Sequence, residues 1–227
     1  MELTYSIRRS AKRRRLTITV ERDRSVIVHA PTGTSDETIR QAVESKRQWL
    51  YQKTQHHQKY RELPHPPGKE LVSGESALYL GRSYQIEVVH DGSREIRFAR
   101  RFVIPSTRGH DRKGVMRDWY VARAEEVILP RVRRHARNLG VQFAKAKIVD
   151  NRYRWGSCTV KDNVNLNWRL IKAPMFVIDY VIVHELAHLL EGNHTAAFWN
   201  VVRTQAPKME KAKNWLMENG QILEVDV

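Results

Sequence analysis

The segment His184-Glu185-Leu186-Ala187-His188 carries the residues of this sequence best suited to metal chemistry. Histidines four positions apart lie one turn apart on the same face of a helix, so both can bind one metal ion through their imidazole nitrogens. This arrangement is typical of zinc sites. The glutamate beside the first histidine is placed to take a proton from a water molecule that the metal activates. The segment predicts a metal-dependent hydrolase with Glu185 as general base.

A catalytic zinc site takes three protein ligands and leaves the fourth position to water. His194 lies six residues after His188, and a chain reversal between them can return its side chain to the metal. Metzincins have the same ten-residue offset between first and third histidine, but their glycine comes where this chain has Glu191. We therefore predict a site of His184, His188 and His194 that is not of the metzincin type.

The elements around these histidines follow from hydrophobic patterning. Residues 175–190 are apolar on nearly every side, which predicts a buried helix with Pro174 as its first residue. We expect Gly192 or Asn193 to end that helix. Residues 147–171 alternate in character around a polar turn and predict paired strands.

The rest of the chain is β-rich at first and helical later. Residues 15–30 predict a β-hairpin with its break at residues 23–25, and a helix should follow, with apolar residues at helical spacing up to Leu50. The other expected elements are a linker over 52–68, strands at 78–80, 84–89 and 102–104, and helices over 115–139, 195–205 and 207–219, the last closed by Gly220. We predict an α+β fold with a β-rich region over 1–108 and a catalytic domain over 109–227.

Composition points to a basic globular protein without disulfides. The 40 Lys and Arg against 25 Asp and Glu give a net charge of +15, which raises the question of a polyanionic partner. The single cysteine, Cys158, fits a reducing compartment, and we see neither an export signal nor a membrane span. We expect a cytoplasmic protein.

Most of the excess charge lies near the N-terminus. Residues 1–60 carry 13 basic and 6 acidic side chains, whereas residues 151–227 carry 9 and 8. Arg8, Arg9 and the run at residues 12–15 form a basic cluster in the hairpin region that can bind nucleic-acid phosphates. A charged, solvated hairpin edge explains the same cluster equally well.

Several motifs together resemble one known family. They are RWGSC at 154–158, NVNLNWRLI at 163–171, DYVIVHELAHLLEGNH at 179–194 and AFW at 197–199. The sequence is similar to the YgjP-like metallopeptidase family, which is related to SprT-like zincins. The resemblance implies a minimal zincin core in which a short sheet packs on the active-site helix. It also implies His184, His188 and His194 as zinc ligands and Glu185 as the catalytic acid and base.

Residues near the metal segment are further candidates for substrate binding. An edge strand before the active-site helix of a zincin commonly aligns an extended substrate by backbone pairing. The substrate-binding candidates are Arg154, Trp155, Gly156, Ser157 and Asn165. A core role for Trp155 and a close strand-to-helix approach at Gly156 are the competing interpretations. Cys158 is expected to be a small buried residue, and Tyr180 faces either the core or the site.

Three functions remain open from the sequence. The first is a zinc peptidase acting on peptides or unfolded proteins, with Mn²⁺ or Ni²⁺ as other possible metals. The second, suggested by one branch of the family, is a nucleotide pyrophosphatase acting on UTP, for which Arg152, Arg154 or Arg169 can hold phosphates. The third is a nucleic-acid-associated protease of the SprT-like kind. The seven histidines other than His184, His188 and His194 are expected at the surface.

Overall fold

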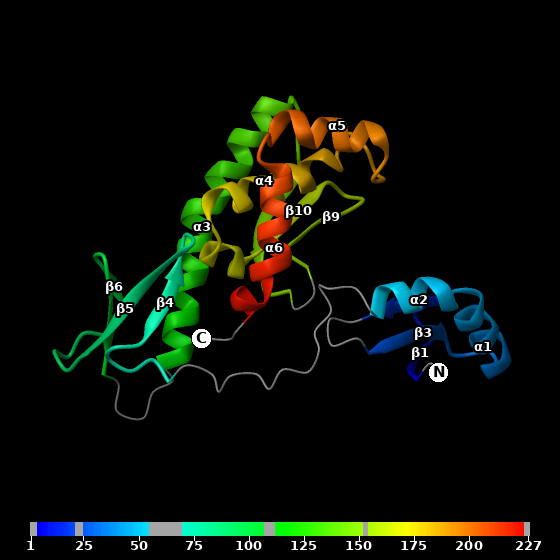
Figure 1. The fold of residues 1–227 in the computed structure, drawn as a ribbon, viewed down its shortest axis with the longest axis horizontal. Helices are drawn as coiled ribbons and strands as arrows, with labels where there is room; N and C mark the ends of the chain where they lie inside the picture. Colours follow the sequence, from blue (N-terminus) through cyan, green and yellow to red (C-terminus); the bar gives the residue numbers. More distant parts are fainter. Residues whose placement is uncertain (1–3, 21–24, 55–69, 107–111, 152–153, 225–227) are drawn as a thin grey trace. The chain divides into compact units, whose positions relative to one another are not determined.

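The computed structural model describes residues 4–20, 25–54, 70–106, 112–151 and 154–224, and the chain forms two compact units, 1–65 and 66–227. Each unit has its own hydrophobic core. The predicted domain boundary at residues 108 and 109 falls within the second unit. The mixed α+β fold class is confirmed, with three small sheets and six α-helices among the described residues (Figure 1).

The N-terminal unit is a three-stranded sheet with two helices on one face (Figure 1). Its elements are β1 (Tyr5–Ser10), β2 (Thr17–Val20), β3 (Val26–Pro31), α1 (Asp36–Ser45) and α2 (Arg47–Thr54). The strand β3 is central, parallel to β1 and antiparallel to β2, so the predicted hairpin is confirmed. Most of the break predicted for this hairpin at residues 23–25, and most of the linker predicted over 52–68, lie outside the described residues. The Ser35 side chain caps α1 by accepting from the Thr38 N–H, and the predicted helix is divided at Lys46.

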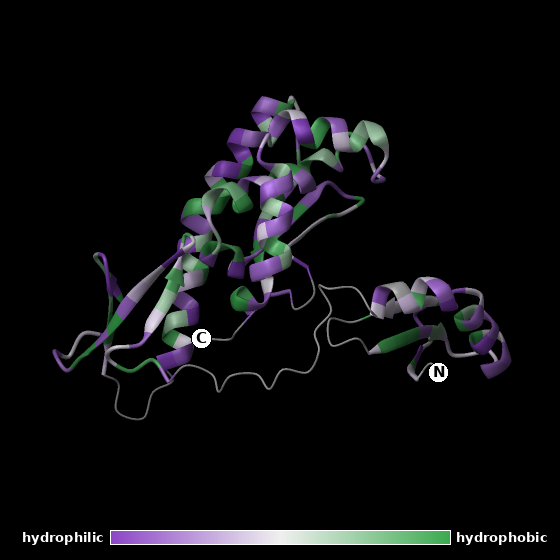
Figure 2. Ribbon diagram, in the orientation of Figure 1, coloured by the Kyte–Doolittle hydropathy of each residue, from purple (hydrophilic) through white to green (hydrophobic). Residues whose placement is uncertain are grey.

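The C-terminal unit begins with a four-stranded sheet in the order β4-β5-β7-β6. These strands are β4 (Ser76–Tyr79), β5 (Arg82–Val89), β6 (Arg97–Phe98) and β7 (Phe102–Pro105). The 28-residue helix α3 (Arg112–Leu139) continues through Pro130 and ends before Gly140, whose φ of +67° suits glycine. Figure 2 shows hydrophobic and hydrophilic residues alternating along this helix. Its Tyr120 hydroxyl donates to the Leu78 carbonyl at 2.6 Å, which ties the sheet to this helix.

A second sheet, in the order β8-β10-β9, supports the metal segment. It comprises β8 (Lys145–Val149), β9 (Gly156–Cys158) and β10 (Asn163–Asn167). The strand β10 is parallel to β8 and antiparallel to β9, which leaves β9 at an edge. The prediction of strand as far as residue 171 is wrong, because η1 (Trp168–Lys172) is a 3₁₀ helix. The Asn167 side chain starts that helix by accepting from the Arg169 N–H.

The metal-segment helix α4 (Met175–Ala187) is buried as predicted, with Pro174 as its N-cap rather than its first residue. The prediction that Gly192 or Asn193 ends it is wrong. The helix already ends at Ala187, where tight turns close it. In these turns the Leu189 N–H donates to the Leu186 carbonyl and the Leu190 N–H donates to the Ala187 carbonyl. His188 is the C-cap and keeps αR geometry, so it stays on the face of His184.

Two more helices complete the unit, α5 (Ala196–Gln205) and α6 (Met209–Glu224). The prediction that Gly220 closes the last helix is wrong, since α6 runs past it. A Cβ at Gly220 would lie 3.6 Å from the Trp155 ring, so this residue sits where the helix meets that ring. Within the described residues no helix is both long and apolar enough to cross a membrane.

Candidate metal centre

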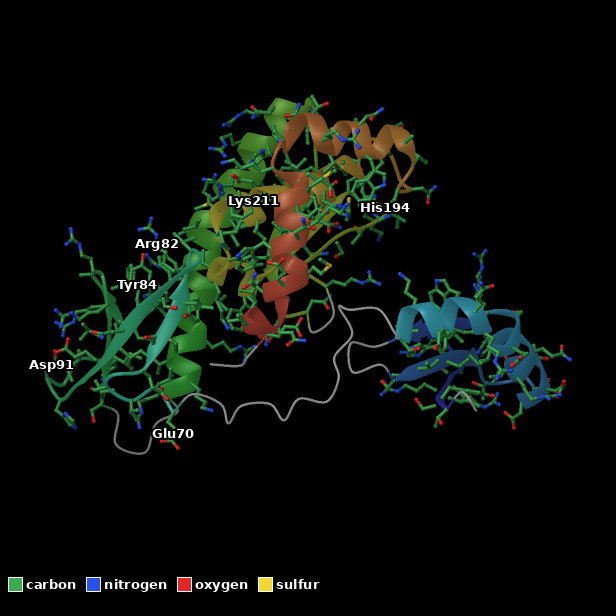
Figure 3. The ribbon with its side chains drawn as sticks, viewed as in Figure 1. Glu70, Arg82, Tyr84, Asp91, His194 and Lys211 are labelled. Carbon is green, nitrogen blue, oxygen red and sulfur yellow. The ribbon has the colours of Figure 1, made fainter. Side chains whose placement is uncertain are left out.

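Three histidine side chains converge at the end of α4. His184 lies on the helix, His188 caps it, and His194 comes from the turn before α5, where Figure 3 labels it. Their ligand nitrogens all lie within 4.8 Å of one another. The chain reversal between His188 and His194 thus has the effect expected from the sequence, and the three nitrogens can hold one metal ion.

The donor set fits a divalent metal ion. The Nε2 atoms of His184 and His194 face each other at 3.0 Å, and the backbone carbonyl of Glu191 lies 3.2 Å from His188 Nδ1. That carbonyl favours the tautomer of His188 that leaves Nε2 free to bind metal. Burial, then the neighbouring His194 and His188, lowers the pKa of His184 to about 4. A neutral imidazole is the form that binds metal.

Aromatic rings from α5 enclose the histidines. The Phe198 ring is fully buried and lies 4.6 Å from the centroids of both His188 and His194. The Trp199 ring stacks on His194 at 5.5 Å. Neither residue was predicted from the sequence to line the site. Their position in the sequence could have indicated this role, because Thr195 is a helix-capping residue just after His194. The Thr195 side chain caps α5 and so places both rings on the first turn of that helix.

Glu185 points from α4 to the edge strand β9. It is only 7% exposed, and a Cβ on Gly156 would lie 2.7 Å from its Oε1 atom. Glycine is therefore required where β9 passes this carboxylate. Burial raises the pKa of Glu185 to about 7, against the lowering effects of a backbone hydrogen bond from Cys158 and of the Arg154 charge.

Comparison with known proteins agrees with this geometry. The YgjP-like, metallopeptidase domain family matches residues 14–219. The chain belongs to this family. In addition, 42% of the chain is similar to 96% of the metallopeptidase zymogen of Pyrococcus abyssi abylysin, with 20% identity and a TM-score of 0.39. No curated protein matches the chain.

Membership of this family indicates a metal-dependent hydrolase.

The candidate substrate residues lie around β9. Arg154 is exposed, two residues before the start of the strand, while Trp155 packs on the main core. The Asn165 amide donates to the Ser157 hydroxyl at 3.3 Å across the β9 and β10 pair. Gly156 lies against Glu185 and the Arg154 charge acts on the same carboxylate, whereas Ser157 and Asn165 join β9 to β10.

Two further residues border the site. Cys158 is half-buried on β9, and burial raises the pKa of its thiol, which is unsuited to thiolate chemistry. Tyr180 is 8% exposed, with its ring 5.9 Å from that of His184, and burial raises its pKa to about 12. Tyr180 is thus a core residue whose ring also lies next to that of His184.

A second polar cluster lies one turn earlier on α4. Asp179 accepts two hydrogen bonds from Arg131 at 2.7 and 2.8 Å, and its Oδ1 lies 3.0 Å from His135 Nε2. The expectation that His135 is at the surface is wrong, because it is 8% exposed on the inward face of α3. Burial acts to raise the pKa of Asp179, but hydrogen bonds from His135 and Arg131 outweigh it and hold that pKa far below its usual value.

Proposed function

We propose that this protein hydrolyses peptide bonds with one divalent metal ion, zinc, held by His184, His188 and His194. The observation that carries the proposal is the convergence of three ligand nitrogens within 4.8 Å beside a buried carboxylate. Imidazole ligands also suit nickel and, less well, manganese. When bound, such an ion polarises the scissile carbonyl and activates a water molecule for attack.

Glu185 is the proposed general base. It accepts the proton of the attacking water and passes it to the leaving amine. Two features support this role. The backbone hydrogen bond from Cys158 orients the carboxylate, and the missing side chain at Gly156 gives it room. A positioned base of this kind contributes roughly 10² to 10⁴ in rate.

The edge strand β9 is the proposed substrate platform. One of its sides pairs with β10, and as the outermost strand it offers the other side to an extended peptide. Because Gly156 lies on this strand against Glu185, a peptide added there runs past the base. An extended backbone is needed for such pairing, so peptides and unfolded proteins are the proposed substrates.

Nucleotide hydrolysis receives less support. Arg169, one of the expected phosphate ligands, donates to Asp150 at 2.5 Å, and its side chain is 11% exposed. Arg117 bonds the other oxygen of Asp150, so one carboxylate already holds both guanidinium groups. Arg152 lies outside the described residues, which leaves Arg154 as the one expected phosphate ligand that is described and exposed.

The test uses Glu185→Gln, with Glu125→Gln as the matched control on the exposed face of α3. Zinc-loaded wild-type protein should cleave unfolded casein, and Glu185→Gln should lose roughly 10² to 10⁴ of that rate while retaining one zinc per chain. Glu125→Gln should behave as wild type. Phosphate release from UTP without casein cleavage would replace the proposal with pyrophosphatase activity.

Gly156→Ala tests the close approach of β9 to Glu185 separately. The new methyl group would lie 2.6 Å from Glu185 Cγ and 2.7 Å from its Oε1 atom, so the Glu185 side chain must move. We expect at least a tenfold loss of kcat with little change in melting temperature. Gly33→Ala, where a Cβ meets nothing within 4 Å, is the control. Full activity in Gly156→Ala would show that the position of Glu185 does not matter.

A further inference from the structure

The charges of the N-terminal unit are sorted between its two sides. Its three described acidic residues are each paired with an arginine: Asp36 with Arg9, Glu37 with Arg40, and Glu44 with Arg47. All three acids lie on α1, so the helical side of the unit is largely neutralised.

Five cations of the sheet side have no carboxylate partner among the described residues. They are Arg8, Lys12, Arg13, Arg14 and Arg15, and all five are exposed. Arg8 lies on β1, and the other four lie in the connection between β1 and β2. The Arg13 guanidinium donates to the Thr17 hydroxyl at 3.0 Å, which holds this connection against the start of β2.

The strand register brings Arg8 and this basic connection to one surface. Residues opposite each other in a ladder point to the same face, and Arg8, His29 and Thr17 form one such row. The neighbouring row consists of Ser6, Ile27 and Thr19. The alternate positions of β3, including Val26 and Val28, pack under the helices, so these two rows lie on the face that α1 and α2 leave uncovered.

The topology places the basic connection at one end of that face. Because β1 and β2 lie on opposite sides of β3, the connection from Ser10 to Thr17 must cross the end of β3 near Pro31. The hydroxyls of Ser6, Thr17 and Thr19 therefore continue the surface that the connection begins. We define this surface, Arg8 with residues 12–15 and the two rows, as the basic sheet face.

We propose that the basic sheet face binds the sugar-phosphate backbone of double-stranded nucleic acid. Arginine, lysine and small hydroxyl side chains are the groups that contact phosphate and sugar oxygens. Apart from the half-buried His29, the two rows contain no aromatic side chain on which unstacked bases can lie, unlike single-strand binding surfaces. Among the described residues of this unit, the exposed aromatic side chains are Trp49 and Tyr51, and both lie on α2, which covers the opposite face. Binding is expected to be independent of base sequence.

This inference stands apart from the proposed peptidase function. Its residues lie in the N-terminal unit, and the metal centre lies in the other unit. Loss of catalysis in Glu185→Gln leaves the basic sheet face unchanged, so the two proposals fail independently.

The experiment measures binding of the full-length chain to a labelled DNA duplex of about 20 base pairs by fluorescence anisotropy. With five cations neutralising phosphates, the log–log salt slope should be about −4.5, so that tripling the salt concentration weakens binding by about 100-fold. Arg14→Gln/Arg15→Gln should weaken binding at least tenfold and make the slope less steep by about 2. Lys46→Gln/Lys53→Gln removes the same charge from the helical side and should change binding less than threefold.

Three results would overturn the proposal. The first is no duplex binding at low salt, and the second is an equal loss in the two double variants. The third is tighter binding to the isolated strand, or to vesicles containing about one third phosphatidylserine, than to the duplex. Circular dichroism of both variants checks that the sheet is intact, which is expected because Arg14 and Arg15 are exposed.

Discussion

Helix α4 carries two polar clusters that differ in how well their groups are satisfied. In the Asp179 cluster, both carboxylate oxygens accept hydrogen bonds from Arg131 on α3, and His135 bonds the same group. In the histidine cluster, the Nε2 atoms of His184 and His194 face each other, and His184 Nδ1 is buried with no partner among the described residues. One cluster is complete within the chain, and the other is not.

The difference separates a structural role from a functional one. A buried group that is fully paired stabilises the helix packing and needs nothing else. Three imidazole groups whose ligand nitrogens lie within 4.8 Å of one another can instead hold a cation between them. Asp179 lies five positions before His184 on one helix, so the same element is anchored at one place and left open for a ligand at the next.

The largest expected effect distinguishes the histidines of the two clusters. His188→Ala removes a proposed ligand and should abolish zinc binding and lower kcat by roughly 10³-fold or more. His135→Ala should keep one zinc per chain and change kcat less than threefold at a temperature well below its melting point. Metal analysis and casein cleavage measure both, and equal losses in the two variants would remove the functional distinction.

Metal removal should come next in size. At a free zinc concentration about 1,000 times the dissociation constant, binding to the folded state adds about 4 kcal/mol to the free energy of unfolding. Urea unfolding with and without a chelator measures this difference. We expect it to vanish in His188→Ala and to persist in Asp179→Asn. A metal effect that survives His188→Ala would place the ion elsewhere.

Asp179→Asn should destabilise the fold without affecting metal binding. The change leaves the half-buried Arg131 guanidinium without its carboxylate, and we expect a loss of about 2 to 3 kcal/mol in the free energy of unfolding. Asp118→Asn, an exposed change on α3, should stay within about 0.5 kcal/mol. A loss below about 1 kcal/mol for Asp179→Asn would show that the cluster is not an anchor.

The stability difference between wild type and Asp179→Asn should also depend on pH. The folded-state pKa of Asp179 is depressed, so its stabilising effect is complete above the unfolded-state value of about 4 and is lost as the pH falls below it. Urea unfolding of both proteins at pH 7, 5 and 3 tests the sign. A difference that grew toward pH 3 would contradict the ion pair.

The smallest effect separates two arginines of the same cluster. The Arg131 side chain is 23% exposed and binds both Asp179 oxygens, whereas that of Arg134 is 49% exposed and lies 3.7 Å from one of them. Arg134→Gln should cost less than about 0.5 kcal/mol because solvent screens the pair. Arg131→Gln should cost about 2 kcal/mol, because it leaves the partly buried carboxylate poorly paired. Unfolding of both variants in urea provides the comparison.

Local patterns predicted the elements of the fold better than their ends. The alternation over 15–30 and the apolar run from 175 follow directly from burial on one face or on all faces. The strand that was predicted to reach residue 171 ends at Asn167. The Asn167 side chain accepts a hydrogen bond from the Arg169 backbone N–H and starts a 3₁₀ helix there. The prediction that His135 is at the surface was wrong because its buried partner, Asp179, lies 44 residues away in the sequence. Local patterning does not show such a partner.

The sequence by itself determined the family and the set of candidate ligands, since His184, Glu185, His188 and His194 are close along the chain and helix periodicity fixes the first three. Tertiary structure alone decided what surrounds them. The fit of Gly156 against Glu185, the Phe198 ring against the histidines and the pairing of Asp179 with Arg131 all join separate elements. Such contacts depend on packing between elements, which no local spacing encodes.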